Sequence, residues 1–270
     1  MSFGEMTQTS GLDSYNDPKF APNVGRYRTR PLSRSEQFAK ITTGNTILDS
    51  LGTEMASFLE PLLDTVELSQ ERVLFQEEDR LNTVYFPLTA VISEFLSLED
   101  GRMVEIAVTG NEGAVGISSI LSGVDTVHNF TQVSQAGTAR TITAYNLNRV
   151  LHSHETLRHN FVGHTDAYIR QISQKAICNM YHSVKERLCT WLLMIQDRSG
   201  RSNMSLTHEQ ISRSLGVNRP SVSRMAHELR ESKLISYVRG GVKIRDRERV
   251  EHAACTCYFE LAAGSGALVH

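Results

Sequence analysis

The sequence is poor in long apolar runs and in cysteine. No run reaches the roughly 18 apolar residues that a membrane-spanning helix needs, so no membrane partner is expected. The opening residues, MSFGEMTQTS, lack the basic segment and apolar run of a secretory signal, and we expect a cytoplasmic protein. The four cysteines, Cys178, Cys189, Cys255 and Cys257, form no Cys-x-x-Cys pair and are expected to be reduced thiols.

Short motifs of common enzyme classes are also missing. The sequence has no Gly-x-Ser-x-Gly, His-Glu-x-x-His, Walker A or Gly-x-Gly-x-x-Gly pattern, and residues 116–120 lack the closing glycine of a nucleophile elbow. We therefore expect a protein that is not an enzyme, with no catalytic residues, no metal site and no cofactor. The segment Cys255-Thr256-Cys257 offers a redox or metal pair as an alternative, but at a frayed C-terminus this spacing is more often incidental.

Acidic and basic residues are unevenly distributed along the 270 residues of the chain. Residues 201–250 contain 11 Lys and Arg against 5 Asp and Glu, whereas the rest of the chain contains 17 against 25. Residues 44–125 are the most acidic part, with 15 acidic residues and only three arginines. An acidic body joined to a basic C-terminal region predicts that only this region meets a polyanion, although charge alone leaves a chance distribution open.

The hydrophobic pattern divides the first half of the chain into three segments. Residues 1–38 mix glycine, proline and polar residues without a period, which predicts a disordered arm. An amphipathic helix is expected at residues 45–63, and short β-rich runs separated by turns follow from 65 to 145. Several short strands with regular turns favour a β-sandwich or jelly roll, and we assign residues 39–155 to this β-roll domain.

Helical periodicity then runs without proline over residues 156–197. A helix of this length has more apolar surface than a small sandwich can cover, so we expect it to pair with the same helix of a second copy. The alternative is a helix that packs only within its own chain. The residues predicted at the dimer seam are Ile169, Ile172, Ala176, Met180 and Val184.

Residues 198–250 contain the pattern of a winged helix-turn-helix. Thr207, with Gln210 three residues on, makes a capping box, and Gly216 supplies the left-handed conformation that ends the first helix. Asn218 caps a second helix, and a hairpin with a basic tip follows it. These features in this order predict binding to DNA, the alternative being a small helical subdomain with surface arginines.

The polar residues that this module directs outward are the predicted DNA contacts. Side chains at the N-terminal end of the second helix read base edges or hold phosphates, and a basic wing adds phosphate contacts. The predicted contact residues are Thr207, Asn218, Arg219, Ser221, Ser223, Arg224, Arg239 and Lys243.

Together these features resemble the catabolite-activator/fumarate-nitrate-reductase regulators, the Crp/Fnr family. The resemblance covers about residues 45–250 and includes VKERLCTWLLMI from Val184, NEGAVGISSIL from Asn111, and LTHEQISRSLGVNRPSVSRMAHELRESKLI. It implies an α+β fold: an N-terminal β-roll of the cyclic-nucleotide-binding type (a jelly roll), a long dimerisation helix, and a C-terminal winged helix-turn-helix. It also implies a homodimeric transcription regulator that binds palindromic promoter DNA and, if it activates transcription, RNA polymerase. Residues 251–270 are left as a C-terminal tail.

The resemblance is weaker at the positions that bind cyclic AMP in this family. Those members carry Gly-Glu-Leu and, further on, Arg-Ser, which hold the ribose and the cyclic phosphate. Here Gly116 keeps the first position, but Ile117 replaces the glutamate, and no Lys or Arg occurs between Arg102 and Arg140. A buried phosphate needs a positive partner or several donors, so cyclic AMP is not the expected ligand and the sensor domain is predicted to be degenerate.

Other readings of the chain stay open. A small-molecule effector, or a rebuilt nucleotide pocket, would use the candidate residues Gly116, Ser118, Ser119, His128, Asn129 and Ser173. An iron–sulfur cluster is not expected, because this family ligates it near the N-terminus and the first cysteine here is Cys178. A haem would have only His128 as a candidate axial ligand in the β-roll. The basic winged domain argues against an interaction module without DNA binding.

Overall fold

The computed structural model describes residues 43–238 and 241–264, so the arm predicted at 1–38 lies outside the described residues. Its N-terminal half contains short strands rich in β-branched and aromatic residues. These strands are β1 (Asp64–Leu68), β2 (Val73–Phe75), β3 (Thr83–Pro87), β4 (Val91–Ser97), β5 (Met103–Thr109), β6 (Phe130–Gln135) and β7 (Gly137–Thr143). They form two antiparallel sheets with the orders β1-β7-β3 and β2-β6-β4-β5.

Apolar side chains from both sheets share one core. Along β6 every second residue is buried, and Ile92 and Val133 of one sheet belong to the same cluster as Tyr85 and Ala139 of the other. Joining two apolar faces removes both from water, which is the main driving force for a sandwich of this kind. The β-roll predicted from the turn pattern is confirmed.

The helix before the β-roll is broken, and the single helix predicted at residues 45–63 is wrong. Three pieces stand in its place, α1 (Thr46–Ser50), α2 (Thr53–Leu59) and the 3-10 turn η3 (Glu60–Leu62). Asn45 caps α1, and its amide donates to the carbonyls of Pro87 and Gly113 at 2.9 Å each, which fixes the start of α1 on the β-roll. Leu51 then has an extended backbone and Gly52 caps α2, so the chain changes direction between the two.

The long helix is also divided in two. After α3 (Ile117–Ser122) and α4 (Ala144–Ser153), the chain forms α5 (Glu155–Tyr181) and α6 (Val184–Ser199). The single helix predicted at residues 156–197 is wrong because Ser183 has an extended backbone and caps α6, with Glu186 completing a capping box. Gly163, in contrast, lies inside α5 without breaking it.

The C-terminal part contains the predicted helix-turn-helix and a three-stranded sheet of order β8-β10-β9. Its elements are β8 (Asn203–Ser205), α7 (His208–Leu215), α8 (Arg219–Glu231), β9 (Ile235–Val238), β10 (Gly241–Ile244), α9 (Arg247–Ala253) and α10 (Cys257–Gly264). The described part of the tail predicted at 251–270 is not frayed, since Tyr258 of α10 is buried and its hydroxyl donates to Asp197 at 2.9 Å.

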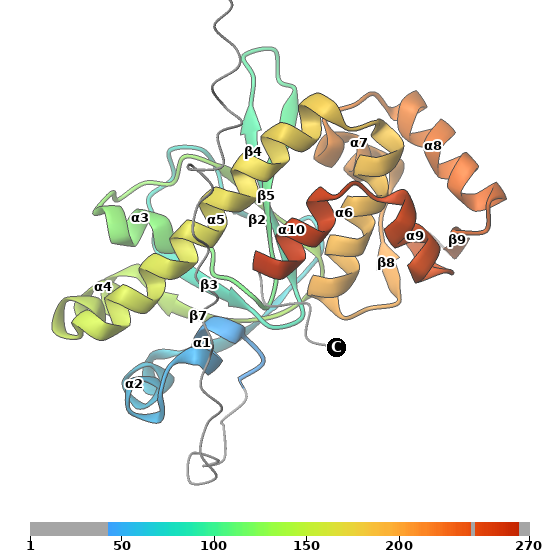
Figure 1. Ribbon diagram of the computed structural model, residues 1–270. Coiled ribbons are helices and arrows are strands. Elements are labelled where there is room, and N and C mark those ends of the chain that lie inside the picture. Colours follow the sequence, from blue (N-terminus) through green and yellow to red (C-terminus); the bar gives the residue numbers. More distant parts are fainter. Residues whose placement is uncertain (1–42, 239–240, 265–270) are drawn as a thin grey trace, which may run out of the picture. The chain divides into compact units, whose positions relative to one another are not determined.

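Figure 1 shows α5 crossing the strands of the β-roll, with α10 beside it and with α7 and α8 beyond its C-terminal end. None of the described helices is long and apolar enough to cross a membrane.

A buried carboxylate on β5 connects this strand with α5, α6 and β4. Glu105 of β5 is fully buried, and its Oε1 accepts from Lys175 Nζ of α5 at 2.5 Å and from Trp191 Nε1 of α6 at 2.9 Å. Its Oε2 accepts from Ser93 Oγ of β4 at 2.8 Å. A buried charge is stable only when it is paired and hydrogen-bonded, so this carboxylate fixes the β-roll, α5 and α6 to one another.

Candidate nucleic-acid interface

The helix-turn-helix begins with α7, whose N-terminus is closed by Thr207. The Thr207 hydroxyl accepts from the Gln210 N–H at 3.2 Å, and the Gln210 side chain accepts from the Thr207 N–H at 2.8 Å. Gly216 ends the helix with a φ of 62°, a left-handed conformation that glycine adopts without steric cost. Ile211 and Leu215 form the buried face of α7, as the sequence predicted.

The second helix, α8, starts directly after this turn. Asn218 caps it by accepting from the Ser221 N–H at 2.9 Å. Its inward face carries Val222, Ala226 and Leu229, each at most 1 % exposed. This face holds α8 against the rest of the domain and leaves the opposite side of the helix to solvent.

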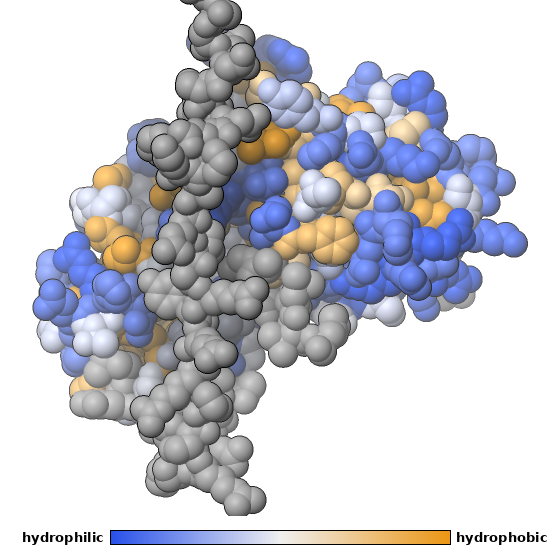
Figure 2. Space-filling model, viewed as in Figure 1, coloured by the Kyte–Doolittle hydropathy of each residue, from blue (hydrophilic) through white to orange (hydrophobic). Residues whose placement is uncertain are grey.

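Polar side chains occupy the solvent side of the first turns of α8. Asn218, Arg219 and Arg224 are exposed, whereas Ser221 and Ser223 are half-buried. In Figure 2 hydrophilic residues cover most of the surface at the right of the view, where α8 lies. Exposed arginines and unpaired N–H groups at a helix N-terminus are suited to base edges and phosphates in a DNA groove.

His208 and Tyr237 also belong to this surface, although no sequence motif pointed to them. His208 Nδ1 lies 3.0 Å from Ser223 Oγ, and its Nε2 lies 2.8 Å from the Tyr237 hydroxyl. Burial, and secondly the positive charge of Arg219, lower the pKa of His208 below its ordinary value, so the ring is neutral near pH 7. His208 of α7 thus holds Ser223 of α8 and Tyr237 of β9 in place. Both contacts depend on the packing of the three elements, which the sequence does not show.

The wing is the hairpin of β9 and β10. Lys243 lies in β10 opposite Ser236 of β9 and Asn203 of β8, and its side chain is half-buried. The wing tip with Arg239, a predicted phosphate contact, lies outside the described residues.

Comparison with known proteins agrees with this geometry. Residues 186–253 match the family of the Crp-like helix-turn-helix domain. This part of the chain is a Crp-like helix-turn-helix domain. No curated protein sequence matches the chain.

Over about three quarters of its length the chain has a Crp/Fnr-like fold, similar to several solved structures. FixK2 of Bradyrhizobium japonicum has a TM-score of 0.61 and 17% identity, with 72% of this chain and 98% of that chain covered. A crp/fnr-family regulator from Eubacterium rectale has 0.59 and 15%, with 77% and 96% covered. The global regulator CLP of Xanthomonas campestris has 0.60 and 13%, with 72% and 100% covered.

Within this Crp/Fnr-like fold, the residues predicted for a ligand pocket have different surroundings. His128 is exposed, with its Nδ1 4.0 Å from Glu78 Oε1, whereas Asn129 bonds to Glu94 of β4 and to Tyr168 of α5. Ser173 of α5 lines a cavity that contains none of the other five candidates. The other candidates, Gly116, Ser118 and Ser119, lie at the start of α3. The rebuilt nucleotide pocket stays a prediction.

Apolar packing surrounds Ile117, the residue that the sequence resemblance sets at the position of the family's glutamate. Ile117, which replaces the glutamate, is 2 % exposed and belongs to the core cluster formed with α4 and α5. Arg80 pairs with Thr126 across an isolated bridge, so the fold brings one arginine to the loop that the sequence showed to be free of basic residues. Arg80 is exposed and follows Glu78 and Asp79, so the segment supplies no net positive charge for a buried phosphate.

A buried acid, Glu94, connects the β-roll with α5. Its Oε2 accepts from the Tyr168 hydroxyl at 2.8 Å and from Asn129 Nδ2 at 3.0 Å. Burial raises the pKa of Glu94 above its ordinary value, and the two hydrogen bonds oppose this effect. The network ties the loop before β6 to the middle of α5.

A cavity of about 650 Å³ lies along α5, next to β5 and α10. Ser173 lines it together with His164, Tyr168, Glu112 and Arg198, and Arg198 Nε donates to Glu112 Oε1 at 2.6 Å. Of the six residues predicted for a ligand pocket, Ser173 alone is among those lining this cavity.

The predicted dimer-seam residues divide into two groups. Ile169, Ala176 and Met180 are exposed on α5, whereas Ile172 of α5 and Val184 of α6 are half-buried. The exposed group continues a solvent-facing apolar stripe of α5 whose large members are Val162, Ile169, Ile177 and Met180, at 49%, 56%, 48% and 74% exposure.

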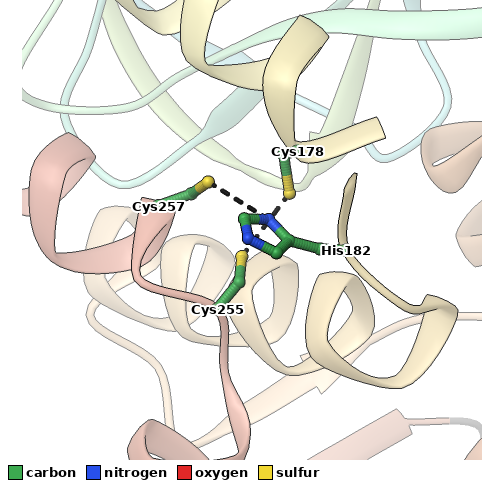
Figure 3. Close-up of side chains that lie close together, drawn as sticks. All are labelled: Cys178, His182, Cys255 and Cys257. Atoms are coloured by element: carbon green, nitrogen blue, oxygen red, sulfur yellow. Dashed lines mark hydrogen bonds between the residues drawn. The ribbon is translucent and has the colours of Figure 1, made fainter. Parts of the chain in front are cut away.

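Four potential metal ligands meet where α5 ends. Figure 3 shows Cys178, His182, Cys255 and Cys257 pointing toward one another from the end of α5 and from the segment around the start of α10. A hydrogen bond with Cys178 lowers the pKa of Cys255 below its ordinary value, and a hydrogen bond with Thr190 lowers it further. Burial of the thiol opposes both effects. From the sequence, the pairing of Cys255 and Cys257 was interpreted as incidental. Cys178 and His182 are far from them along the chain, so their proximity could not be seen there.

Proposed function

We propose that this chain is a transcription regulator that binds palindromic promoter DNA as a homodimer, in the cytoplasm, through its Crp-like domain. The observation that carries the proposal is the N-terminal end of α8, where Arg219 and Arg224 are exposed beside the capping Asn218. The apolar side of α8 is fully buried, so the packed helix presents these side chains to solvent on its opposite side. No catalytic role is proposed.

Within this interface, Arg224 is assigned to base recognition and Lys243 to phosphate binding. Arginine binds guanine O6 and N7 with two parallel hydrogen bonds, which a helix in the major groove can direct at one base pair. Ser223 stands next to Arg224, and Arg219 is shared between base and phosphate. Lys243 lies on the wing, from which side chains reach the backbone beside the groove.

The dimer is supported by the apolar stripe of α5. Ile169 and Met180 expose more than half of their surface, which is unfavourable for large apolar side chains on an isolated monomer. A parallel α5 from a second copy covers them, and the two-fold axis then presents two α8 helices to two half-sites. Promoter binding of this kind also makes RNA polymerase the expected partner of an activator.

The sensor domain is proposed to be degenerate and not to bind cyclic AMP, because Ile117 packs into the core and the loop before β6 lacks net positive charge. The alternative is a regulator that responds to another nucleotide. Calorimetry with a panel of nucleotides separates the two: saturable sub-micromolar binding of cyclic AMP contradicts the first proposal.

The experiment that tests the proposed function is selection of bound DNA from a random pool with the full-length chain. A two-fold symmetric site with half-sites about one helical turn apart is expected. The matched control is Arg224→Ala, which removes one predicted base contact and leaves the apolar face of α8 intact. Recovery of no enriched sequence, or of the same site by the variant with unchanged affinity, contradicts the assignment of α8.

A further inference from the structure

Three cysteines and one histidine form a cluster that the Crp-like domain does not explain. Cys178 lies in the last turn of α5, and His182 is the cap of that helix, its N–H donating to the Cys178 carbonyl at 3.2 Å. Cys255 and Cys257 flank the start of α10. The three cysteines are buried and His182 is half-buried, so the cluster lies at the protein surface with its histidine outermost.

The ligand atoms have the spacing of a single tetrahedral metal ion. Zinc bound by sulfur at about 2.3 Å and by nitrogen at about 2.0–2.1 Å places the sulfur atoms about 3.8 Å apart and sulfur and nitrogen about 3.5 Å apart. Here Cys178 Sγ lies 3.5 Å from Cys255 Sγ, and Cys257 Sγ lies 3.4 Å from His182 Nδ1. All four ligand atoms lie within 4.8 Å of one another.

Two other uses of these residues fit less well. A disulfide between Cys178 and Cys255 would need a bond of about 2.05 Å and would leave Cys257 and His182 without a role. A four-iron cluster is larger than one ion and holds its ligands further apart than the separations found here.

The surroundings supply the outer contacts that metal-bound thiolates need. Gln174 Nε2 donates to Cys257 Sγ at 3.0 Å, and Thr190 Oγ1 lies 3.0 Å from Cys255 Sγ. Zinc with three thiolates and a neutral imidazole has a net charge of −1. Arg187 interacts electrostatically with Cys178 and Cys255 and so offsets this charge.

We propose that Cys178, His182, Cys255 and Cys257 bind one zinc ion. Binding replaces the protons of the three thiols with the metal, and no electron transfer is involved. The ion fastens the segment before α10 to the end of α5, directly beside the break between α5 and α6. Because α6 begins the Crp-like domain, the zinc site fixes the junction through which α5 meets that domain.

The test is the metal content of the full-length chain, purified in reductant without a polyhistidine tag. Mass spectrometry of the elements should give about one zinc per chain for the wild type. Cys255→Ser should reduce the zinc content to near zero, and His182→Ala should reduce it strongly. The matched control is Cys189→Ala. Cys189, in α6, is buried like the three cluster cysteines but lies outside the cluster, so this variant should keep the zinc.

A second measurement covers variants that fold poorly. Wild-type protein stripped with a chelator and titrated with Co²⁺ should develop thiolate-to-cobalt charge-transfer bands and the visible bands of a tetrahedral site, which Zn²⁺ then abolishes. Three results overturn the proposal: wild type that takes up neither metal in reductant, iron and inorganic sulfide in place of zinc, or Cys255→Ser with an unchanged zinc content.

Discussion

Replacing Lys175 by methionine should strongly destabilise the chain, because it leaves the carboxylate of Glu105 buried without its cation. The Glu105 side chain is fully shielded from solvent, and that of Lys175 is 18% exposed. Methionine keeps the length and apolar stem of lysine, so the packing around α5 changes little. The substitution therefore isolates the loss of the charge pair.

The expected magnitude follows from this burial. Removing one partner of a buried ion pair costs about 3–5 kcal/mol, a large part of the roughly 5–15 kcal/mol that stabilises a typical domain. Glu105→Gln should cost less, about 1–3 kcal/mol, because the partly exposed Lys175 can reach water while the glutamine oxygen still accepts from Trp191. The double variant should be more stable than the sum of the single effects predicts, by about 1–3 kcal/mol.

Urea denaturation of the four proteins measures this coupling. Trp191, the only tryptophan in the sequence, donates to Glu105 and so reports the junction by fluorescence, while circular dichroism reports the helices. Additive single effects, or a cost of Lys175→Met below about 1 kcal/mol, would refute the argument that the buried charge requires its partner.

Three further predictions concern DNA, assembly and pH. Arg224→Ala should cost about 1–3 kcal/mol of DNA-binding free energy per half-site and relax the preference at one base pair, whereas Lys243→Ala should weaken binding to all sequences equally and reduce the slope of log affinity against log salt by about one. Binding to a randomised operator library at several salt concentrations separates the two effects. A uniform loss of affinity for both variants contradicts the assignment. Ile169→Glu should shift a dimer toward monomer in light scattering, and a wild type that is monomeric at micromolar concentration refutes the α5 seam. Since burial raises the pKa of Glu94, the stability that its protonated form contributes is complete below the ordinary pKa of 4.5 and is lost as pH rises through the folded-state pKa. Glu94→Gln should lack this loss of stability. Urea midpoints of wild type and variant that run parallel across pH would contradict this prediction.

Much of the fold and of the candidate interface could be predicted because the deciding contacts are local. The Thr207 capping box, the left-handed Gly216 and the Asn218 cap each involve residues within about one helical turn, so their spacing in the sequence is their spacing in space. The buried faces of α7 and α8 follow from helical periodicity in the same way. The break before α6 had a local signal as well, the Ser183 and Glu186 capping box, which the continuing apolar period concealed.

Contacts between distant residues were decided by the tertiary structure alone. Cys178 and Cys255 are 77 positions apart, and Lys175 and Trp191 reach Glu105 across 70 and 86 positions. No periodicity or spacing encodes such pairs, because they depend on how the β-roll, α5, α6 and the C-terminal segment pack. The sequence by itself therefore determined the helix-turn-helix and its outward arginines, where short-range backbone geometry suffices. Only the packed chain decided that two cysteines near the C-terminus lie beside a third cysteine and a histidine at the end of α5.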